Sequence, residues 1–567
     1  MNAMPAVPPA PDMGRTDAPK PMAAGRHQVL CQRRTWLAAT CTVLLIMLAT
    51  LIHSGEAADP VPEPEQVAWG RRLYLDGTLG PGQPLTGRVQ DDVALTAQPA
   101  ACVHCHQRSG LGTAEGTILV PAITGPALAQ ATPPGPRQRP AYSDATLLRA
   151  IREGVDAAGQ PLHPLMPRYV LPDAAASALV AYLKTLSAHW SPGVSEQAVY
   201  FATVVTEDVA PARRQAMLDV LNAYVMETNA GRALASGSSH GPSQTRSAAG
   251  SMRAWVLSPW TLTGPPTTWP AQLDAYYRAQ PVFAVLSGIS ASGWRPVHEF
   301  CERHEVPCLL PNTALPVLTT TDFYTLYLSR GLTLEAEALA AYLSRGSSPV
   351  RLLQVFRRDL TGQTASSALR RAFVGIDTAS VVDWVLEGRE PLSPEALAAR
   401  LAATQSTAAV LWLPREGWVG LGAGRWPLAE PVHLYLSSTL LNGELAAVPE
   451  TLRRLSSVIH PFSPQRRIRR LEGWLGSHGL ALIDQPVQAQ TYLAGLIASE
   501  GLKRVGERLY RDYFLEVIDR LAMAPMGSGF PHPDFAPSRR YLINGAYILE
   551  VGEGDGPPIQ SALWIGP

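Results

Sequence analysis

The segment Cys102-Val103-His104-Cys105-His106 constrains this chain more than any other short stretch. Two thiols separated by two residues lie on one side of a helical turn, where each can add to a vinyl group of a haem. The histidine after the second thiol is then held beneath the iron as an axial ligand. With 6 cysteines and 13 histidines in 567 residues, this order rarely arises by chance. We therefore predict one covalently bound haem c, attached at Cys102 and Cys105 with His106 on the iron.

Zinc sites and redox-active dithiols also use a Cys-x-x-Cys pair. A zinc site needs a second pair of ligands, and the other candidate, Cys301 with His304, lies far along the chain. Cys301 and Cys308 form a second thiol pair, for which we expect a disulfide if the protein is exported. Two buried free thiols, or a small zinc site with the nearby His298 and His304, remain alternatives.

Three helices are predicted around the haem motif. Pro64 can occupy the first position of a helix over Glu65–Tyr74. Gly154 ends a helix over Ala145–Gly154, and a leucine stripe marks Pro172–Leu186.

Together with the haem motif, these helices resemble a class I c-type cytochrome over roughly residues 60–190. The resemblance implies an all-α domain whose first and last helices cross closely. Gly70 would permit that contact, with Tyr74 and Tyr182 nearby.

The resemblance also implies that the second axial ligand comes from the loop His163–Tyr169. Met166 is followed by proline, as the distal methionine of the family often is. A thioether favours reduced iron and raises the potential relative to a second histidine. The rival ligand is His163, and the alternative role for Met166 is packing in the core.

The first residues of the chain predict export. An apolar run over residues 36–52 follows Arg26, Arg33 and Arg34, and small residues near Ala57 and Ala58 allow cleavage. The run is at the short end of what spans a bilayer, so a retained anchor in the inner membrane is the alternative to a cleaved signal. In either case we expect residues after 58 to lie in the periplasm of a Gram-negative bacterium.

Charge and length narrow the function further. The 47 basic residues equal the 47 acidic ones, and no basic patch suggests a nucleic-acid partner. The length implies two or more domains. No P-loop and no HExxH motif occurs, so we expect an electron-transfer protein rather than an enzyme.

Beyond the haem region, strands and helices alternate, which favours parallel α/β layers. Glu227–Ser251 is rich in Ser, Gly and Ala and predicts a mobile surface loop, while Tyr541–Val551 predicts a hairpin. Strands are expected at Ala198–Val205, Arg253–Leu257, Val282–Gly288, Val306–Pro311, Arg351–Phe356, Ala409–Leu413 and Val432–Leu436. Helices are expected at Pro211–Met226, Trp269–Arg278, Val297–His304, Thr333–Ser344, Pro394–Thr404, Ala489–Ser499 and Glu507–Leu521.

This order resembles type I periplasmic solute-binding proteins, the fold of branched-chain amino-acid receptors. Phe283–Ile289 followed by Val297–Asn312 is similar to the strand, turn, helix and Pro-flanked strand of that family. Phe323–Leu343 is similar to the segment where an arginine precedes a long helix, and Asn544–Ile548 is similar to the final strand. The resemblance implies a two-lobed α/β domain with a cleft between the lobes.

In such folds a ligand lies at the carboxyl ends of strands. The residues that follow two expected strands are candidates for contact with a small solute: Ser287, Gly288, Ser290, Ser292, Asn312 and Thr313. Ser and Gly after a strand are also ordinary turn residues. Thr206-Glu207-Asp208 replaces the glycine-rich opening of the family, and no acidic partner for a substrate ammonium is assignable. A surface for docking a partner protein is therefore the alternative.

We divide the chain into an N-terminal segment with the signal or anchor (1–58), a cytochrome domain (59–190), a linker (191–196) and a binding-protein-like domain (197–567). The expected function is periplasmic electron transfer, with a donor dehydrogenase or an acceptor cytochrome as partner. A redox-linked solute sensor and a transport-type binding protein are the alternatives.

Overall fold

The structure is a computed structural model that describes most of the chain after residue 63. The described residues are 64–90, 92–135, 138–237, 253–346, 349–376, 379–422, 432–443, 445, 448–461, 469–521, 539–551 and 559–566. The predicted export segment and its cleavage sites lie outside them. Within these ranges, no helix combines the length and apolar character that crossing a membrane requires.

The haem-motif domain is built around the crossing of two helices. Helix α2 (Pro64–Asp76) crosses α6 (Asp173–Thr185) at Gly70, where an added Cβ would lie 2.0 Å from the carbonyl oxygen of Ala178. The rings of Tyr74 and Tyr182 pack beside the crossing, 5.3 Å apart. The close approach and the tyrosine pair confirm the prediction. The remaining helices are α3 (Val103–His106), α4 (Gly125–Leu128) and α5 (Asp144–Glu153), with a 3-10 turn at Gln98–Ala100.

Local sequence fixes both ends of α5, of which the end at Gly154 was predicted. Ser143 caps its first turn by accepting from the N–H of Thr146, and Thr146 returns a bond to the N–H of Ser143. Gly154 ends the helix in the left-handed region at φ 70°.

The prediction of an all-α domain is wrong at its edge. A three-stranded sheet of order β4-β3-β7 joins Val93–Thr96, Thr86–Val89 and Arg168–Tyr169. Two small hairpins add β1 (Thr78–Gly80) with β2 (Gln83–Pro84), and β5 (Ala114–Glu115) with β6 (Ile118–Leu119). Such short strands show no alternation long enough to detect in the sequence.

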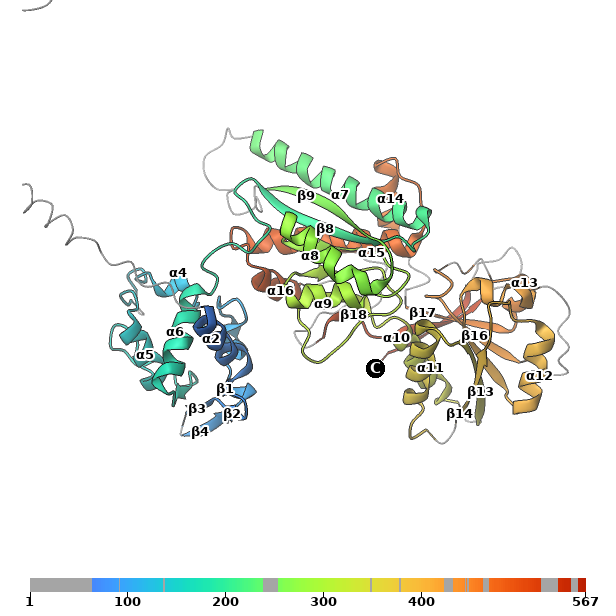
Figure 1. Ribbon diagram of the computed structural model, residues 1–567, viewed down its shortest axis with the longest axis horizontal. Helices are drawn as coiled ribbons and strands as arrows, with labels where there is room; N and C mark the ends of the chain where they lie inside the picture. Colours follow the sequence, from blue (N-terminus) through green and yellow to red (C-terminus); the bar gives the residue numbers. More distant parts are fainter. Residues whose placement is uncertain are drawn as a thin grey trace, which may run out of the picture. The chain divides into compact units, whose positions relative to one another are not determined.

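The first lobe of the α/β domain is a six-stranded parallel sheet of order β18-β12-β11-β10-β8-β9, with helices on both faces (Figure 1). Helices α7, α14, α15 and α16 pack on one face, and α8 and α9 on the other. The strands are β8 (Ala198–Thr206), β9 (Ala254–Leu262), β10 (Ala284–Leu286), β11 (Cys308–Leu309), β12 (Thr325–Ser329) and β18 (Tyr541–Ile543). The helices are α7 (Pro211–Gly237), α8 (Trp269–Ala279), α9 (Arg295–Arg303), α14 (Arg469–Ser477), α15 (Gln485–Val505) and α16 (Arg511–Asp519), with a 3-10 turn at Pro266–Thr268.

The second lobe is a seven-stranded sheet of order β14-β13-β15-β16-β17-β19-β20, in which the last two strands run antiparallel to their neighbours. Helices α10 and α11 cover one face, and α12 and α13 the other. The strands are β13 (Val350–Arg357), β14 (Ala379–Leu386), β15 (Ala408–Trp412), β16 (His433–Ser437), β17 (Ser456–His460), β19 (Ala546–Val551) and β20 (Ile559–Ile565). The helices are α10 (Leu332–Leu343), α11 (Leu360–Ala372), α12 (Pro394–Thr404) and α13 (Glu450–Arg453), with 3-10 turns at Arg415–Gly417 and Val419–Gly422.

Two expectations about this domain are wrong. The predicted loop Glu227–Ser251 is helical in its first part, because α7 continues to Gly237, and residues 238–252 lie outside the described residues. The predicted hairpin Tyr541–Val551 does not form. Its first half, β18, pairs with β12 in the first lobe, while β19 pairs with β17 in the second. The segment therefore passes from one sheet to the other, and β19 forms its hairpin with β20.

Replacing Gly70 by Ala should destabilise the haem-motif domain by about 1–3 kcal/mol, because the new methyl group meets backbone that cannot yield. Thermal unfolding of the purified protein measures the effect. Gly80→Ala is the matched control, since nothing lies within 4 Å of an added Cβ there. Equal stability of the two variants would contradict the close crossing.

Candidate haem site and solute cleft

The two thiols and the histidine of the haem motif lie on one helical turn. Cys102 precedes α3 and its carbonyl accepts from the N–H of His106 at 3.0 Å. Cys102 is buried and Cys105 is exposed, and burial raises the pKa of the Cys102 thiol to about 12. Cys102 therefore stays protonated in the folded apoprotein, and the pair faces the domain core on one side and solvent on the other.

His106 is held in the form that binds a metal. Its ring is buried, and Nδ1 lies 3.0 Å from the carbonyl oxygen of Pro121. Burial lowers its pKa, which favours the neutral imidazole. With Nδ1 donating to the carbonyl, the lone pair lies on Nε2, and that is the arrangement of a ligating histidine.

Met166 and His163 have different surroundings. Met166 is partly buried and packs against the apolar cluster that contains Cys102. His163 is exposed, and its Nδ1 accepts from the N–H of Leu165 at 3.2 Å. The guanidinium of Arg168 donates to the carbonyls of Pro164 and Met166, each at 3.2 Å, and so orders the loop. Of the two candidates, Met166 is the one directed at the core that holds the haem motif.

These residues fit a covalent haem. Cys102 belongs to the apolar cluster of the domain and Met166 packs against it, while Cys105 and His106 lie on the helical turn that follows Cys102. Such a donor set suits an iron porphyrin with histidine and methionine ligation.

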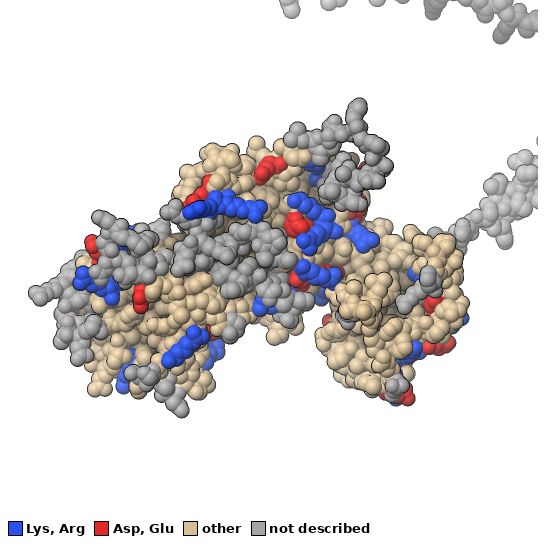
Figure 2. Space-filling view, turned by 180° about the vertical axis from the view of Figure 1, so that it is seen from behind, with Lys and Arg blue, Asp and Glu red and all other residues tan. Residues whose placement is uncertain are grey.

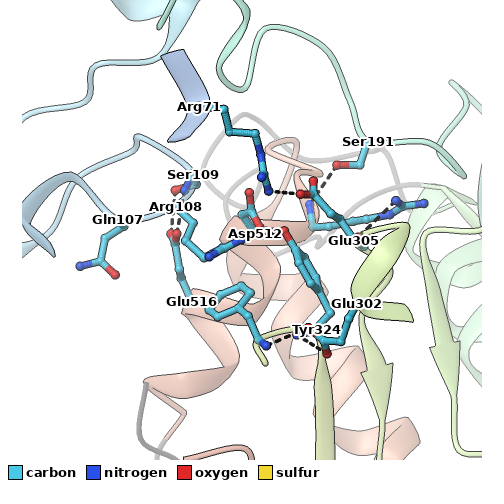
Figure 3. Close-up of polar contacts among 12 residues, drawn as sticks. Arg71, Gln107, Arg108, Ser109, Ser191, Glu302, Glu305, Tyr324, Asp512 and Glu516 are labelled. Carbon is cyan, nitrogen blue, oxygen red and sulfur yellow. Dashed lines mark hydrogen bonds and ion pairs between the residues drawn. The ribbon is translucent and has the colours of Figure 1, made fainter. Parts of the chain in front are cut away.

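The loop after His106 contacts the first lobe of the α/β domain (Figure 3). Arg108 forms an ion pair with Asp512 at 3.5 Å and donates to the Tyr324 hydroxyl at 3.3 Å. Its guanidinium stacks over the Phe323 ring at 4.4 Å. A second ion pair joins Arg71 to Glu305. These contacts belong to one compact unit that extends from Pro64 to Pro567.

The segment between the domains is fixed by Arg511. Its buried guanidinium donates to the Pro192 carbonyl at 3.0 Å and also to the carbonyls of Phe283 and His304, both at 3.1 Å. Its own N–H donates to the Ser191 hydroxyl at 3.0 Å. The predicted linker is therefore anchored to the first lobe.

The predicted cleft residues Ser287 and Asn312 bond within the first lobe. The Ser287 hydroxyl lies 3.0 Å from that of Thr491 on α15, and the Asn312 amide donates to both hydroxyls, at 3.0 and 3.3 Å. All three side chains are buried. Their polar groups are thus already partnered.

The other cleft candidates lie around the same strand ends. Gly288, in the left-handed region at φ 110°, has its carbonyl 3.2 Å from the Asn312 amide. The exposed Ser292 donates to Asp208, and the Thr313 hydroxyl accepts from the N–H of Leu315 at 3.2 Å. The Ser290 hydroxyl is buried and has no hydrogen-bond partner in the described part of the chain.

Cys301 and Cys308 are buried neighbours without a bond between the sulfurs. Burial raises the pKa of Cys301, and the adjacent Cys308 raises it further. The two histidines near them have other partners: His298 pairs with Asp322 and His304 with Asp274, each at 2.9 Å. Among the described residues, no group of three His, Cys, Asp or Glu side chains is placed to hold a metal ion.

On the face shown in Figure 2, basic and acidic side chains lie beside one another, and most of the described surface carries neither. That face offers no broad region of one charge.

Comparison with known proteins agrees with both parts of this description. A family model described as Cytochrome c matches residues 94–187, a range that includes the haem motif and Met166. An ABC transporter substrate-binding protein from Sphaerobacter thermophilus has a TM-score of 0.50 at 14% identity, covering 65% of this chain and 99% of its own. The chain joins a cytochrome c domain to a type I periplasmic-binding-protein fold.

Two further solved structures are similar at lower TM-scores. A fatty acid ABC transporter substrate-binding protein from Thermomonospora curvata has a TM-score of 0.48 at 14% identity, covering 67% of this chain and 94% of its own. A branched chain amino acid ABC transporter from Thermus thermophilus, with bound valine, has a TM-score of 0.47 at 15% identity, covering 65% and 97%. No curated protein matches the chain significantly.

Sequence reasoning missed the residues that join the cytochrome c domain to the binding-protein fold. Glu516 and Asp512 fall inside a predicted helix, and Arg108 lies two residues after the last residue of the haem motif. Acidic residues among apolar ones in a predicted helix are usual for an amphipathic helix with a solvent-exposed face. They therefore gave no sign of a contact with another domain. Only the tertiary structure brings them to Arg108 and Ser109.

Replacing Thr491 by Val should destabilise the binding-protein fold by about 1–2 kcal/mol, because Ser287 and Asn312 lose a buried partner. Denaturant unfolding measures the change. Thr321→Val, at an exposed position, should leave stability within about 0.5 kcal/mol. Unchanged stability of the Thr491 variant would show that its bonds to Ser287 and Asn312 contribute nothing to the free energy of unfolding.

Proposed function

We propose that this protein is a periplasmic electron carrier with one covalent haem c. The observation that supports this most is the buried His106, whose Nδ1 is bonded to Pro121 and whose Nε2 remains for iron, beside a buried and an exposed thiol on one turn. Cys102 and Cys105 would form the thioethers, and Met166 would be the second axial ligand. When bound, the haem supplies one-electron transfer.

The chain's own residues would set the potential and the access to the site. The Pro121 carbonyl fixes the ring orientation and tautomer of His106 and makes its Nε2 a stronger donor. The apolar cluster around Cys102 excludes water from that side, which favours the less charged reduced state. Ordering of the loop by Arg168 holds Met166 in place for either oxidation state.

The binding-protein fold would bind a small solute or a partner protein. The solved structures it resembles include substrate-binding proteins of ABC transporters. We place the solute at the carboxyl ends of β8, β10 and β11. The hydroxyl groups of Ser290 and Ser292 would form hydrogen bonds with it. Gly288, Ser287, Asn312 and Thr313 would shape the wall.

The proposed partners and location follow from both domains. The donor is a periplasmic dehydrogenase, or the acceptor is another cytochrome. Residues 1–58 would export the chain or anchor it to the inner membrane, 59–190 form the cytochrome domain, 191–196 the linker and 197–567 the binding-protein-like domain. Cys301 and Cys308, already neighbours, would form a disulfide in that compartment.

The haem assignment predicts a specific optical spectrum. Protein exported by a host that attaches haem should show a c-type α-band when reduced and a weak near-infrared methionine–iron band when oxidised. Cys102→Ala combined with Cys105→Ala should yield protein without covalent haem, as judged by haem staining after denaturing electrophoresis. A wild-type protein that stains negative would overturn the proposed function.

Met166→Ala should abolish the near-infrared band and lower the midpoint potential, because a thioether stabilises reduced iron. His163→Ala is the control from the same loop and should keep both properties, since its side chain is exposed. A band that disappears in the His163 variant and survives in the Met166 variant would exchange the two assignments.

A solute for the second domain is sought by thermal shift, because a ligand that binds only the folded state raises apparent stability. Amino acids and small carboxylates are the first set to test. A solute that also shifts the haem potential would favour a redox-linked sensor over a simple carrier.

A further inference from the structure

A carboxyl group from the binding-protein fold holds the loop that follows the haem motif. Ser109 is fully buried, and its N–H and its hydroxyl donate to the two oxygens of Glu516 at 2.8 and 2.6 Å (Figure 3). The carbonyl of Ser109 accepts from the Ser187 hydroxyl at 2.7 Å. The Ser109 hydroxyl also accepts from the N–H of Leu111 at 3.2 Å. Every polar atom of Ser109 is therefore partnered, and two of its four bonds end on Glu516.

This loop is firmly connected to His106. The N–H of Gly112 donates to the His106 carbonyl at 3.1 Å, which closes the loop on the predicted iron ligand. The Tyr74 hydroxyl donates to the Gln107 carbonyl at 2.6 Å. Glu516 is thus connected to His106 through a short, hydrogen-bonded stretch of chain.

Among the described residues, no basic side chain forms a hydrogen bond or ion pair with Glu516. Asp512 on α16 raises the pKa of Glu516, and Arg520, which follows α16, lowers it; Tyr74 faces it from α2. Arg108, the nearest basic residue of the loop, pairs with Asp512 instead. Since Glu516 is almost fully buried, an ionised form depends on the two bonds from Ser109.

Burial raises the pKa of Glu516 from 4.5 to about 8, although the bonds from Ser109 act in the opposite direction. The carboxyl group therefore titrates where an exposed glutamate is already ionised. A charge that appears or disappears at this buried position acts strongly on a nearby charge, because little water screens it.

We propose that Glu516 is a redox-linked proton-binding residue, supplied to the haem site by the other domain. This rests on the proposed function, since it needs an iron that changes charge beside His106. Glu516 is ionised while the site is oxidised, where its negative charge offsets the additional positive charge of the iron. When one electron arrives from the donor protein, Glu516 takes one proton from solvent. When the acceptor protein takes the electron, Glu516 releases the proton to solvent.

The test is the midpoint potential of the full-length haem protein, measured from about pH 5 to about pH 9. The wild-type potential should fall as pH rises, with a slope approaching about 59 mV for each tenfold decrease in proton concentration. Glu516→Gln, which mimics the neutral acid, should match the wild type at low pH, lie above it at high pH and lose the slope between.

Two further variants separate this role from a structural one. Ser109→Ala removes one of the bonds that stabilise the ionised form, so the sloping region should move to higher pH. Glu500→Gln, at a surface ion pair with Arg504 on α15, should retain the wild-type profile. A wild-type potential independent of pH, or a slope that persists in Glu516→Gln, would overturn the proposal.

A measurement without haem distinguishes failure of this inference from failure of the proposed function. A carboxyl whose pKa rises from 4.5 to about 8 on folding binds its proton more tightly in the folded state. Stability of the apoprotein should therefore fall as pH rises from 4.5 to about 8 and stay level above. The stability of the Glu516→Gln apoprotein should fall less over that pH range. Identical profiles would show that Glu516 binds no proton there, whether or not the protein holds haem.

Discussion

The junction between the two domains depends on two buried ionisable side chains from α16. The guanidinium of Arg511 donates to backbone carbonyls of the linker and of the first lobe. The carboxyl group of Glu516 accepts from the loop that follows the haem motif. Buried polar groups of this kind are stabilising only when every bond is made. Loss of any one of these bonds would therefore leave a buried polar group without its partner.

This junction also places unlike chemistry side by side. The cytochrome c domain contributes the donor set for iron and a loop rich in polar backbone groups. The binding-protein fold contributes a low-dielectric surface that carries Phe323, Tyr324 and, from α16, Asp512 and Glu516. An acid placed on such a surface keeps its proton more readily than one in solvent. A property that the haem domain lacks on its own is thus supplied by its neighbour in the chain.

Local patterns predicted many of the elements, and pairing between distant segments accounts for the hairpin that was predicted wrongly. The capping residues of α5 and the apolar stripe of α6 are visible in the sequence, and both helices lie where expected. Strand β18 was assigned the wrong partner, because Asn544-Gly545 between two apolar runs is the usual sign of a hairpin. Instead β18 pairs with β12, and β19 pairs with β17. Both pairings depend on sheets that other parts of the chain form.

The candidate site residues likewise differ in how far local sequence predicts their surroundings. The haem motif specifies its own geometry, since its residues are adjacent in sequence. Ser287 and Asn312 carry suitable groups for a ligand, yet Thr491, from a helix far along the chain, bonds to both. Whether a polar residue after a strand faces a cleft or the interior depends on such partners, and no spacing rule reveals them.

Anchoring of the linker by Arg511 has a consequence for how electrons would reach the iron. In a multidomain redox protein with a flexible linker, the haem domain can move between an electron donor and an electron acceptor. Here Ser191 and Pro192 of the linker are hydrogen-bonded to Arg511 of the first lobe. The linker therefore allows the cytochrome c domain little independent movement. Donor and acceptor must each travel to it, so their collision rates, rather than the rotation of a tether, would govern turnover.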